Sequence, residues 1–222
     1  MVFDEVLELA RSVSHFTIAG EGNVSVRDGD AMLIKASGST LETMTDEDLV
    51  RCDLDGNALE GEEKKPSMEV SFHAWILKTF PEINCVCHTH PTHTIKILCS
   101  GRIRDFANKR LFPDQVVRNG TKSCVVPYAT PGAPLREEIK KSVEEFVGRN
   151  GYFPKLILLK NHGIITASTS IQEATVSTLM CEKSAEIYIG AKMLNIIQFL
   201  TPEEVAAVDT NPSEKYRREL YK

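Results

Sequence analysis

Residues 1–19 place apolar side chains at the spacing of one helix face, and Gly20 follows as a residue typical of a helix end. This pattern predicts an opening helix. Its apolar face comprises Val6, Leu7, Ala10 and Val13.

Residues 22–37 change to an alternation of apolar and polar positions on either side of Asp28-Gly29-Asp30. Such alternation predicts strands, and an Asp-Gly turn between two strands predicts a β-hairpin. The sheet that contains this hairpin cannot be purely parallel, because the two strands of a hairpin run in opposite directions.

Further along the chain, helical periodicity and short apolar runs follow one another. Helices are predicted in a short stretch from residue 45, over 66–80, 91–101, 133–150 and 170–193, and as short turns after 201. Strands are predicted over 50–59, 83–87 and 123–130, and on both sides of 161–163. Strands interleaved with helices indicate a layered α/β fold. Neither a repeat nor a linker interrupts the pattern, so one domain spanning residues 1–222 is expected.

The composition is that of a soluble globular protein, with 42% hydrophobic and 26% charged residues among 222. No stretch is apolar enough to span a membrane. The N-terminus lacks the features of a secretory signal, so a cytoplasmic location is expected. The net charge of -5 disfavours a general nucleic-acid binder and requires any anionic substrate to be bound locally.

The cysteines lie mostly within apolar segments and lack the dense spacing of a disulfide-rich secreted domain. They are therefore expected to be reduced, buried thiols. The six positions are Cys52, Cys85, Cys87, Cys99, Cys124 and Cys181.

Three of the six histidines lie in the segment CHTHPTH at residues 87–93. Alternation along a strand points His88 and His90 to the same side, where both imidazoles can reach one metal ion. His162 stands between two apolar runs, and Gly163 after it allows a tight turn, which makes His162 the natural third ligand. Three neutral imidazoles suit zinc or a similar ion and leave a position open for substrate. The plainer interpretation is a surface pair at a strand end and an unrelated His162.

The other histidines and one pair of thiols are weaker candidates. His15 and His73 are expected to be packing or surface residues, whereas His93 could support a ligand from the following helix. Cys85 and Cys87 form a competing metal pair, but alternation places them on the opposite strand face. Thiolate zinc sites also usually contain C-x-x-C, which this chain lacks.

Small polar turns at residues 22–23, 37–38 and 66–67 could bind a phosphate group through backbone N–H groups and hydroxyls. Each turn taken alone is more simply a turn or a helix cap. Glu69 falls in the first turn of the helix predicted to begin at residue 66, where a carboxylate complements the helix dipole. Near a metal ion the same carboxylate could move protons beside a carbonyl group.

Six segments, in this order, resemble the class II aldolase and adducin-head family, typified by fuculose-phosphate aldolase. They are GNVS (22–25), ASG (36–38), KPSME (65–69), HTHP (88–91), PYA (127–129) and NHG (161–163). The segments span most of the chain, which makes their joint signal specific.

The resemblance implies a role for each matched residue. Zinc would be bound by His88, His90 and His162, and Glu69 would act as acid and base. Substrate phosphate would be bound by Asn23, Ser37, Gly38 and Ser67. The resemblance also implies a three-layer α/β/α fold with a central, largely antiparallel, mixed sheet, and a cyclic homotetramer with its active site near a subunit interface.

Three local features refine this resemblance. Residues 111–115 (LFPDQ) resemble the aldolase portion of bifunctional rhamnulose-phosphate aldolase/dehydrogenase proteins, so the chain could be fused to a dehydrogenase domain in a longer protein. Met68 stands where the family has a second phosphate-binding serine. The tyrosine that a neighbouring subunit supplies as proton donor has no clear counterpart, and Asp114 or Tyr128 could substitute for it.

The activity that the resemblance implies is that of a metal-dependent aldolase. A ketose 1-phosphate of the deoxyhexulose or pentulose class would be cleaved through a metal-stabilised enediolate into dihydroxyacetone phosphate and an aldehyde. A Schiff-base aldolase using Lys160 or Lys35 is the mechanistic rival. Pentulose-phosphate 4-epimerases of the family carry aspartate at the position of Glu69, which favours cleavage here. Adducin heads, which lack the metal ligands, provide the non-catalytic alternative of an interaction module.

Overall fold

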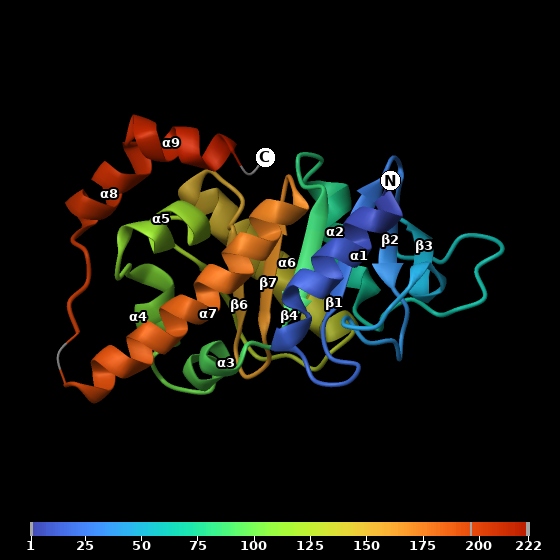
Figure 1. The fold of residues 1–222 in the computed structure, drawn as a ribbon, viewed down its shortest axis with the longest axis horizontal. Helices are drawn as coiled ribbons and strands as arrows, with labels where there is room; N and C mark the ends of the chain where they lie inside the picture. The colour runs from blue at the N-terminus through green and yellow to red at the C-terminus, as the bar shows by residue number, and fades with distance from the viewer. Residues whose placement is uncertain (1, 196, 221–222) are drawn as a thin grey trace.

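The computed structural model describes residues 2–195 and 197–220, which form a seven-stranded sheet with helices on both faces (Figure 1). The strands are β1 (Asn23–Asp28), β2 (Ala31–Lys35), β3 (Leu49–Asp53), β4 (Cys85–Thr89), β5 (Cys124–Val126), β6 (Leu156–Leu159) and β7 (Ile164–Ser168). Their order is β3-β2-β1-β4-β7-β6-β5. Among these described strands only β5 and β6 pair in parallel. The predicted three-layer α/β/α fold with a mixed, largely antiparallel sheet is confirmed.

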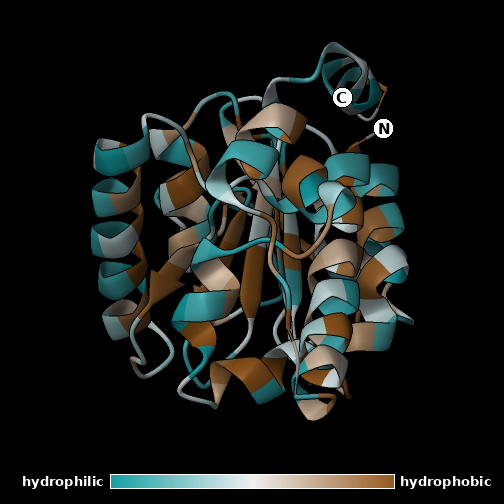
Figure 2. Cartoon of the chain, turned by 90° about the vertical axis from the view of Figure 1, so that its left-hand side faces the viewer, coloured by the Kyte–Doolittle hydropathy of each residue, from teal (hydrophilic) through white to brown (hydrophobic). Residues whose placement is uncertain are grey.

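Two helical layers cover the sheet. One contains α1 (Val2–Val13) and α7 (Ile171–Met193), which pack on each other, and the other contains α2 (Val70–Thr79) and α6 (Ala133–Asn150), which do the same. In Figure 2 the largely hydrophobic strands stand between these layers, and the helices turn their hydrophilic sides outward. This is the amphipathic arrangement that the helical periodicity predicts.

Each layer encloses its own hydrophobic core. On one face, Leu77 of α2 and Ile139 of α6 belong to the same buried cluster as Val86 of β4. On the other face, Leu9 of α1 belongs to the same buried cluster as Cys87 of β4. Neighbouring residues of β4 therefore enter different cores, which confirms the predicted alternation along this strand.

The remaining helices lie around these layers. They are α3 (Thr92–Leu98), α4 (Ile103–Asn108), α5 (Pro113–Asn119), α8 (Pro202–Thr210) and α9 (Pro212–Glu219), with 3-10 turns η1 (Ser14–Phe16) and η2 (Asp46–Asp48). The sequence pattern does not predict α4 or α5. These helices have six and seven residues, fewer than two full turns, so no periodicity can develop along them.

The first helix ends at Val13 rather than at residue 19. The 3-10 turn η1 follows it, and the N–H of Thr17 donates to the carbonyl of Ser14 at 3.0 Å. Thr17 itself is extended, which ends helical structure before Gly20.

The second helix begins at Val70 rather than at residue 66. Glu69 is its N-cap residue, with φ -98° and ψ 9°, so it does not lie in the first helical turn as the sequence pattern predicts. A carboxylate at this position belongs to the loop that enters the helix. Its side chain can therefore turn toward the sheet instead of lying along the helix surface.

All six cysteines are free thiols, and five of them are buried. The expectation of burial is wrong for Cys99, which is exposed at the end of α3. Burial raises the pKa of Cys52, Cys87, Cys124 and Cys181 to about 12. Thiols with such pKa values remain protonated at neutral pH and are poor metal ligands.

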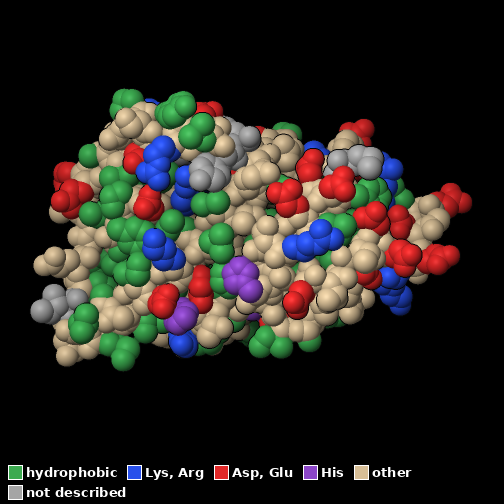
Figure 3. Space-filling model, viewed as in Figure 1, with side chains coloured by type: hydrophobic (Ala, Val, Ile, Leu, Met, Phe, Trp, Pro, Cys, Tyr) green, Lys and Arg blue, Asp and Glu red, His purple; other side chains and the backbone are tan. Residues whose placement is uncertain are grey.

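The surface charge is unevenly distributed. Figure 3 shows acidic side chains gathered at the end of the molecule that holds β3, while basic side chains are scattered over the whole of this face. Within the described residues, no helix combines the length and the apolar character that crossing a membrane requires.

The strand directions bring several loops to one end of the sheet. Asn23, the first residue of β1, is paired with His88 of β4. Thr89, the last residue of β4, is paired with Ile164, the first residue of β7. Lys35 ends β2 at the same end, because β2 runs antiparallel to β1. The ends of β5 and β6 join them, so residues far apart in the sequence meet there.

Replacing Leu77 with Ala should destabilise the fold by about 2–5 kcal/mol, because its side chain is fully buried in the core between α2 and the sheet. Leu179 on α7 is 40% exposed, and its replacement with Ala should change the stability by less than about 1 kcal/mol. Urea unfolding of both variants measures the difference. Equal losses would contradict the assignment of Leu77 to this core.

Candidate metal and proton-transfer site

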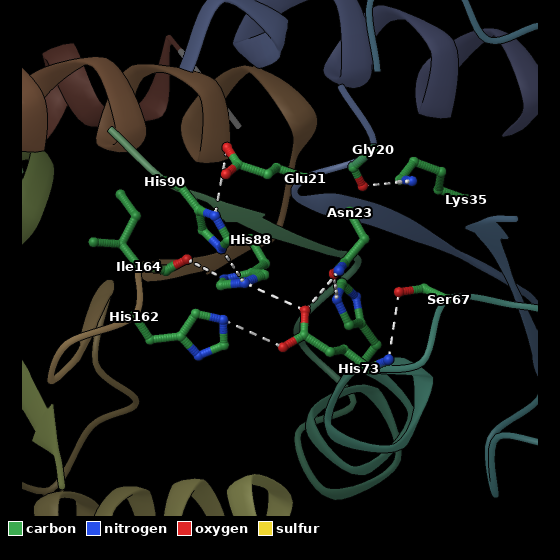
Figure 4. Close-up of polar contacts among 11 residues, drawn as sticks. Gly20, Glu21, Asn23, Lys35, Ser67, His73, His88, His90, His162 and Ile164 are labelled. Atoms are coloured by element: carbon green, nitrogen blue, oxygen red, sulfur yellow. Dashed lines mark hydrogen bonds and ion pairs between the residues drawn. The ribbon is translucent and has the colours of Figure 1, made fainter. Parts of the chain in front are cut away.

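Three imidazoles converge at the end of the sheet where β4 meets β7 (Figure 4). His88 lies within β4, His90 directly follows that strand, and His162 lies in the turn between β6 and β7. One ring nitrogen of each lies within 4.8 Å of the others. The Nε2 atoms of His88 and His90 are 3.0 Å apart. The structure thus brings together the three histidines that the sequence selects as metal ligands.

Gly163 explains how the β6–β7 turn comes so close to β4. A Cβ atom at this position would lie 2.5 Å from Cδ2 of His90 and 2.6 Å from the carbonyl oxygen of Thr89. Asn161, two residues earlier, has φ 55°, a left-handed conformation that asparagine tolerates better than most residues. The sequence N-H-G is therefore suited to a turn that points His162 at the other two rings.

The protonation of His88 is fixed by its backbone partner. Its Nδ1 lies 2.8 Å from the carbonyl oxygen of Ile164, an acceptor, so Nδ1 must carry the proton. The Nε2 lone pair of the neutral ring then faces His90. A backbone carbonyl bound to the far nitrogen is the usual support for a metal-binding imidazole.

Burial keeps the three rings neutral. It lowers the pKa of His88, and it lowers the pKa of His90 to about 4, with the nearby charge of a protonated His88 acting in the same direction. Burial also lowers the pKa of His162. Imidazole binds metal ions in its neutral form, so these rings are prepared for ligation at neutral pH.

The carboxylate of Glu69 lies beside two of the three rings. Its Oε2 lies 3.3 Å from Nε2 of His88, and its Oε1 lies 3.5 Å from Nε2 of His162. Burial would raise the pKa of Glu69, but the charge that His88 carries when protonated, the N–H of Asn23 and the charge of a protonated His162 together lower it below its usual value. The carboxylate is therefore ionised at neutral pH.

The cluster has the properties of a transition-metal site. It offers three neutral nitrogen donors, and Oε1 of Glu69 is buried without a hydrogen-bond partner. An ionised oxygen is costly to bury unpartnered, and a cation at this position would compensate it. Imidazole ligands favour zinc and related transition metals over magnesium or calcium. The residues thus fit a divalent transition metal.

Asn23, His73 and Ser25 form a buried polar network beside Glu69. The side-chain N–H of Asn23 donates to Oε2 of Glu69 at 2.8 Å, and Oδ1 of Asn23 lies 2.5 Å from Nε2 of His73. On the far side of the ring, Nδ1 of His73 lies 2.7 Å from the hydroxyl oxygen of Ser25. Sequence reasoning treats His73 as a packing or surface residue and misses these contacts. Its place one helical turn after Glu69 was the available signal.

The predicted phosphate-binding residues occupy adjoining loops. Ser37 and Gly38 are exposed just after β2, and the N–H of Ser37 donates to the carbonyl of Lys65 at 2.9 Å. Ser67 is buried, and its hydroxyl accepts the N–H of Glu69 at 3.4 Å. These loops are side by side and lead directly to Glu69. Asn23, also predicted to bind phosphate, is 3% exposed, with its side chain committed to the network described above.

Lys35 connects the loop that precedes β1 with the loop that follows β2. Its buried ammonium donates to the carbonyls of Ser39 at 2.6 Å, Gly20 at 3.3 Å and Ala36 at 3.4 Å. Burial lowers the pKa of Lys35. All three hydrogens of the ammonium are thus used in loop contacts, which disfavours Lys35 as a Schiff-base nucleophile. Lys160, the other candidate nucleophile, is exposed in the turn that precedes His162.

The structure does not bring either candidate proton donor into polar contact with the cluster. Asp114 lies at the start of α5 and pairs with Arg217 at 3.1 Å. Tyr128 lies just beyond β5 and is 60% exposed. Within the described part of the chain, no hydrogen bond or ion pair joins either residue to Glu69 or the three histidines.

Two acidic residues near the cluster escape sequence reasoning. Oε2 of Glu21 lies 3.7 Å from Nδ1 of His90 and accepts the N–H of Ile18 at 3.0 Å. Glu182 of α7 accepts the N–H of His93 and contacts Nδ1 of the same residue, both at 2.8 Å. Glu182 therefore holds the start of α3, which follows the ligand pair. Long-range contacts of this kind leave no local pattern in the sequence.

Comparison with known proteins shows the family to which the chain belongs. Residues 5–189 match the family described as Class II Aldolase and Adducin N-terminal domain, and the chain belongs to this family. It is 32% identical over 204 residues to a 3-oxo-tetronate 4-phosphate decarboxylase of Haemophilus influenzae, covering 90% of this chain and 92% of the relative.

Two further relatives carry an aldolase name. An L-fuculose phosphate aldolase of Methanococcus maripaludis is 31% identical over 173 residues, covering 78% of this chain and 86% of the relative. The solved structure of an L-fuculose 1-phosphate aldolase superposes with a TM-score of 0.81 at 26% identity, covering 97% of this chain and 96% of that one. The matched relatives thus include two kinds of lyase, an aldolase and a decarboxylase.

The convergence of the three histidines predicts that the purified chain binds a divalent transition metal and that His162→Ala weakens this binding. The loss should exceed the roughly 10–100-fold typical of residues that only support a ligand. Isothermal titration with zinc after chelation measures it. His93→Ala is the matched control, because it removes a neighbouring histidine outside the cluster; equal losses in both variants would contradict the ligand set.

The metal-free protein should lose stability as the pH falls below 6.5. Burial, helped by the charge of a protonated His88, lowers the pKa of His73 to about 3. Near pH 6.5 the unfolded chain therefore binds a proton that the folded chain does not bind. Below this pH each such histidine lowers the free energy of unfolding by roughly 1.4 kcal/mol per pH unit. Urea unfolding at several pH values between 7.5 and 4.5, with chelator present, measures the slope. In His73→Gln the slope should be smaller, whereas an unchanged slope would argue against a neutral His73.

Proposed function

We propose that the protein is a metal-dependent carbon–carbon lyase of a phosphorylated sugar, and that its reaction is the aldol cleavage of a ketose 1-phosphate. The products would be dihydroxyacetone phosphate and an aldehyde. The observation that carries this proposal is the convergence of three neutral imidazoles with an ionised Glu69 whose Oε1 has no hydrogen-bond partner. The family membership supports it.

The metal, for which zinc is our first choice, would be held by His88, His90 and His162. When bound, it would supply electrostatic stabilisation of the negative charge that develops on the substrate oxygens as the bond breaks. Glu69 would move the proton at the carbon next to the carbonyl, since its carboxylate lies beside the ring nitrogens and is held by Asn23 on one oxygen only. The other oxygen, Oε1, would exchange the proton.

The phosphate group would be bound by the adjoining loops that contain Ser37, Gly38 and Ser67. The N–H groups and hydroxyls of these loops lie at the same end of the sheet as Glu69, and the buried ammonium of Lys35 provides a positive charge nearby. Asn23 was the fourth predicted phosphate ligand. We propose instead that Asn23 acts mainly on Glu69, because both ends of its amide are already hydrogen-bonded.

Aldol cleavage also requires a group that takes the proton from the hydroxyl of the departing aldehyde. Asp114 and Tyr128 are our candidates, acting from a neighbouring copy in a homotetramer, since neither makes a polar contact with the cluster within the described chain. The exposure of both side chains supports this proposal, because an intersubunit role requires them at the surface. A cytoplasmic location is consistent with such an enzyme of sugar metabolism.

Decarboxylation of a 3-oxo acid phosphate is the second candidate, and two observations favour it. The decarboxylase relative is 32% identical over 90% of the chain. In addition, loss of carbon dioxide leaves no aldehyde hydroxyl to deprotonate, so it needs neither Asp114 nor Tyr128. Both reactions break the bond between a hydroxylated carbon next to a ketone and its neighbour, and both require a proton at that carbon from a group such as Glu69.

Replacing Glu69 with Gln should lower kcat by roughly 10²–10⁴-fold while the bound metal is retained, because Gln cannot exchange the proton but leaves the three histidines in place. Turnover and metal content of the same preparation are measured together. Glu182→Gln is the matched control, as it changes a carboxylate that lies outside the cluster. Undiminished turnover in Glu69→Gln would eliminate the proposed role.

The two candidate reactions can be separated by their products. The metal-loaded enzyme is incubated with a panel of ketose 1-phosphates and, separately, with 3-oxo-tetronate 4-phosphate. Release of an aldehyde together with dihydroxyacetone phosphate supports the aldolase, and release of carbon dioxide supports the decarboxylase. Formation of an epimer with no cleavage would reject both.

A further inference from the structure

His73 is a fully buried, polar side chain whose two ring nitrogens are both hydrogen-bonded. It extends from α2 toward β1, where Ser25 and Asn23 lie on the same strand face, two residues apart. The amide of Asn23 links this ring to Glu69, because its oxygen contacts Nε2 of His73 and its N–H group donates to Oε2 of Glu69. His73 therefore has no direct contact with the three metal-ligand candidates in the hydrogen-bond network, and its link to the site runs through Asn23.

The direction of each hydrogen bond in this network follows from the carboxylate at its end. The side-chain N–H group of Asn23 donates to Oε2 of Glu69 at 2.8 Å, which sets the orientation of the amide. The oxygen of the same amide then faces His73 and accepts from Nε2 at 2.5 Å. The proton of the neutral ring is thus on Nε2, and Nδ1 accepts the hydroxyl hydrogen of Ser25 at 2.7 Å. The hydrogen bonds that join Ser25, His73, Asn23 and Glu69 are therefore consistent with only one placement of the protons.

We infer that His73 is a positioning residue that holds the amide of Asn23 in the orientation Glu69 requires. An amide can rotate by half a turn with little change in shape, which would place its oxygen against the carboxylate and repel it. The N–H of His73 opposes that rotation, because it would then face an N–H group of Asn23. The inference rests on the proposed function, since it gives Glu69 a proton-transfer role that depends on its orientation.

This arrangement also accounts for the asymmetry of the carboxylate. Oε2 is bound by Asn23, whereas Oε1 has no hydrogen-bond partner and faces His162 at 3.5 Å. Because Oε2 is fixed by Asn23, Oε1 is the oxygen that remains to exchange a proton with the substrate. If Asn23 turned, Glu69 would lose its anchor and the geometry of Oε1 would vary, while His88 would stay in place because its Nδ1 is bound to the carbonyl of Ile164.

The test compares two substitutions of the same residue. His73→Gln keeps an N–H donor near the position of Nε2, whereas His73→Leu keeps the bulk but removes both polar atoms. His73→Leu should lower kcat by about 10–100-fold, with KM and zinc affinity little changed, and His73→Gln should restore most of kcat. Thr178→Val serves as the control for the loss of a buried hydrogen bond, since Thr178 lies in the other helical layer, bonded to Thr166. It should retain full activity.

A second measurement tests the inference without turnover. Nitrogen-15 NMR of histidine side chains in the metal-free wild-type protein reports which ring nitrogen carries the proton, and His73→Gln assigns the signal. A proton on Nε2 of His73 is expected. A proton on Nδ1, or equal losses of kcat in His73→Leu and His73→Gln, would overturn the inference. Failure of the proposed function is a separate result: the wild-type enzyme would then cleave no substrate, whatever the state of His73.

Discussion

The antiparallel pairing of β4 with β1 on one side and β7 on the other is the interaction on which the site depends. It puts Asn23 directly opposite His88 and the start of β7 opposite the end of β4. Once these registers are set, the turn that carries His162 and the strand end that carries His90 have little freedom. A slip of one residue in either pairing would turn His88 into the opposite core. The rest of the site is built from loops that attach to this frame.

The second condition is the exclusion of water. Burial lowers the pKa of each ligand candidate and of His73, so four imidazoles can be crowded together as neutral rings. In water, protonation of several neighbouring rings would make them repel one another. The same burial makes the carboxylate of Glu69 strongly dependent on its partners. Removal of solvent therefore prepares the nitrogen donors and raises the importance of the hydrogen bond from Asn23.

Much of this architecture could be predicted from the sequence, because it follows local rules. The hairpin around Gly29, the alternation in β4 and the tight turn at Gly163 each have a short-range physical cause. The pattern around Gly163 indicated His162 as a third ligand, and the family resemblance strengthened its combination with the other two histidines. Contacts between distant segments could not be predicted in this way, which is why Glu21 facing His90 was missed.

Two errors show how far local rules extend. The pattern of residues 66–80 places Glu69 inside a helix, whereas the chain enters α2 only at Val70, since the loop before it is held by pairing of Ala36 with Pro66. His73 is buried, as the packing interpretation expects, but its polar role is not predicted, because its partners Ser25 and Asn23 are 48 and 50 positions away. In both cases a tertiary contact decided the outcome.

The pairing of Ala36 with Pro66 and the hydrogen bond from Ser37 to Lys65 bring together the two ends of a long segment, residues 36–66. Beyond Ser37 and Gly38, the chain between these points, including β3 and the acidic segment after it, leaves the site and returns to the same place. Insertions, deletions or a grafted peptide near the exposed turn at Gly61 should therefore be absorbed there without displacing the loops that carry Ser37 and Ser67. This segment is therefore where the length and sequence of the chain can change most freely, in evolution or by design.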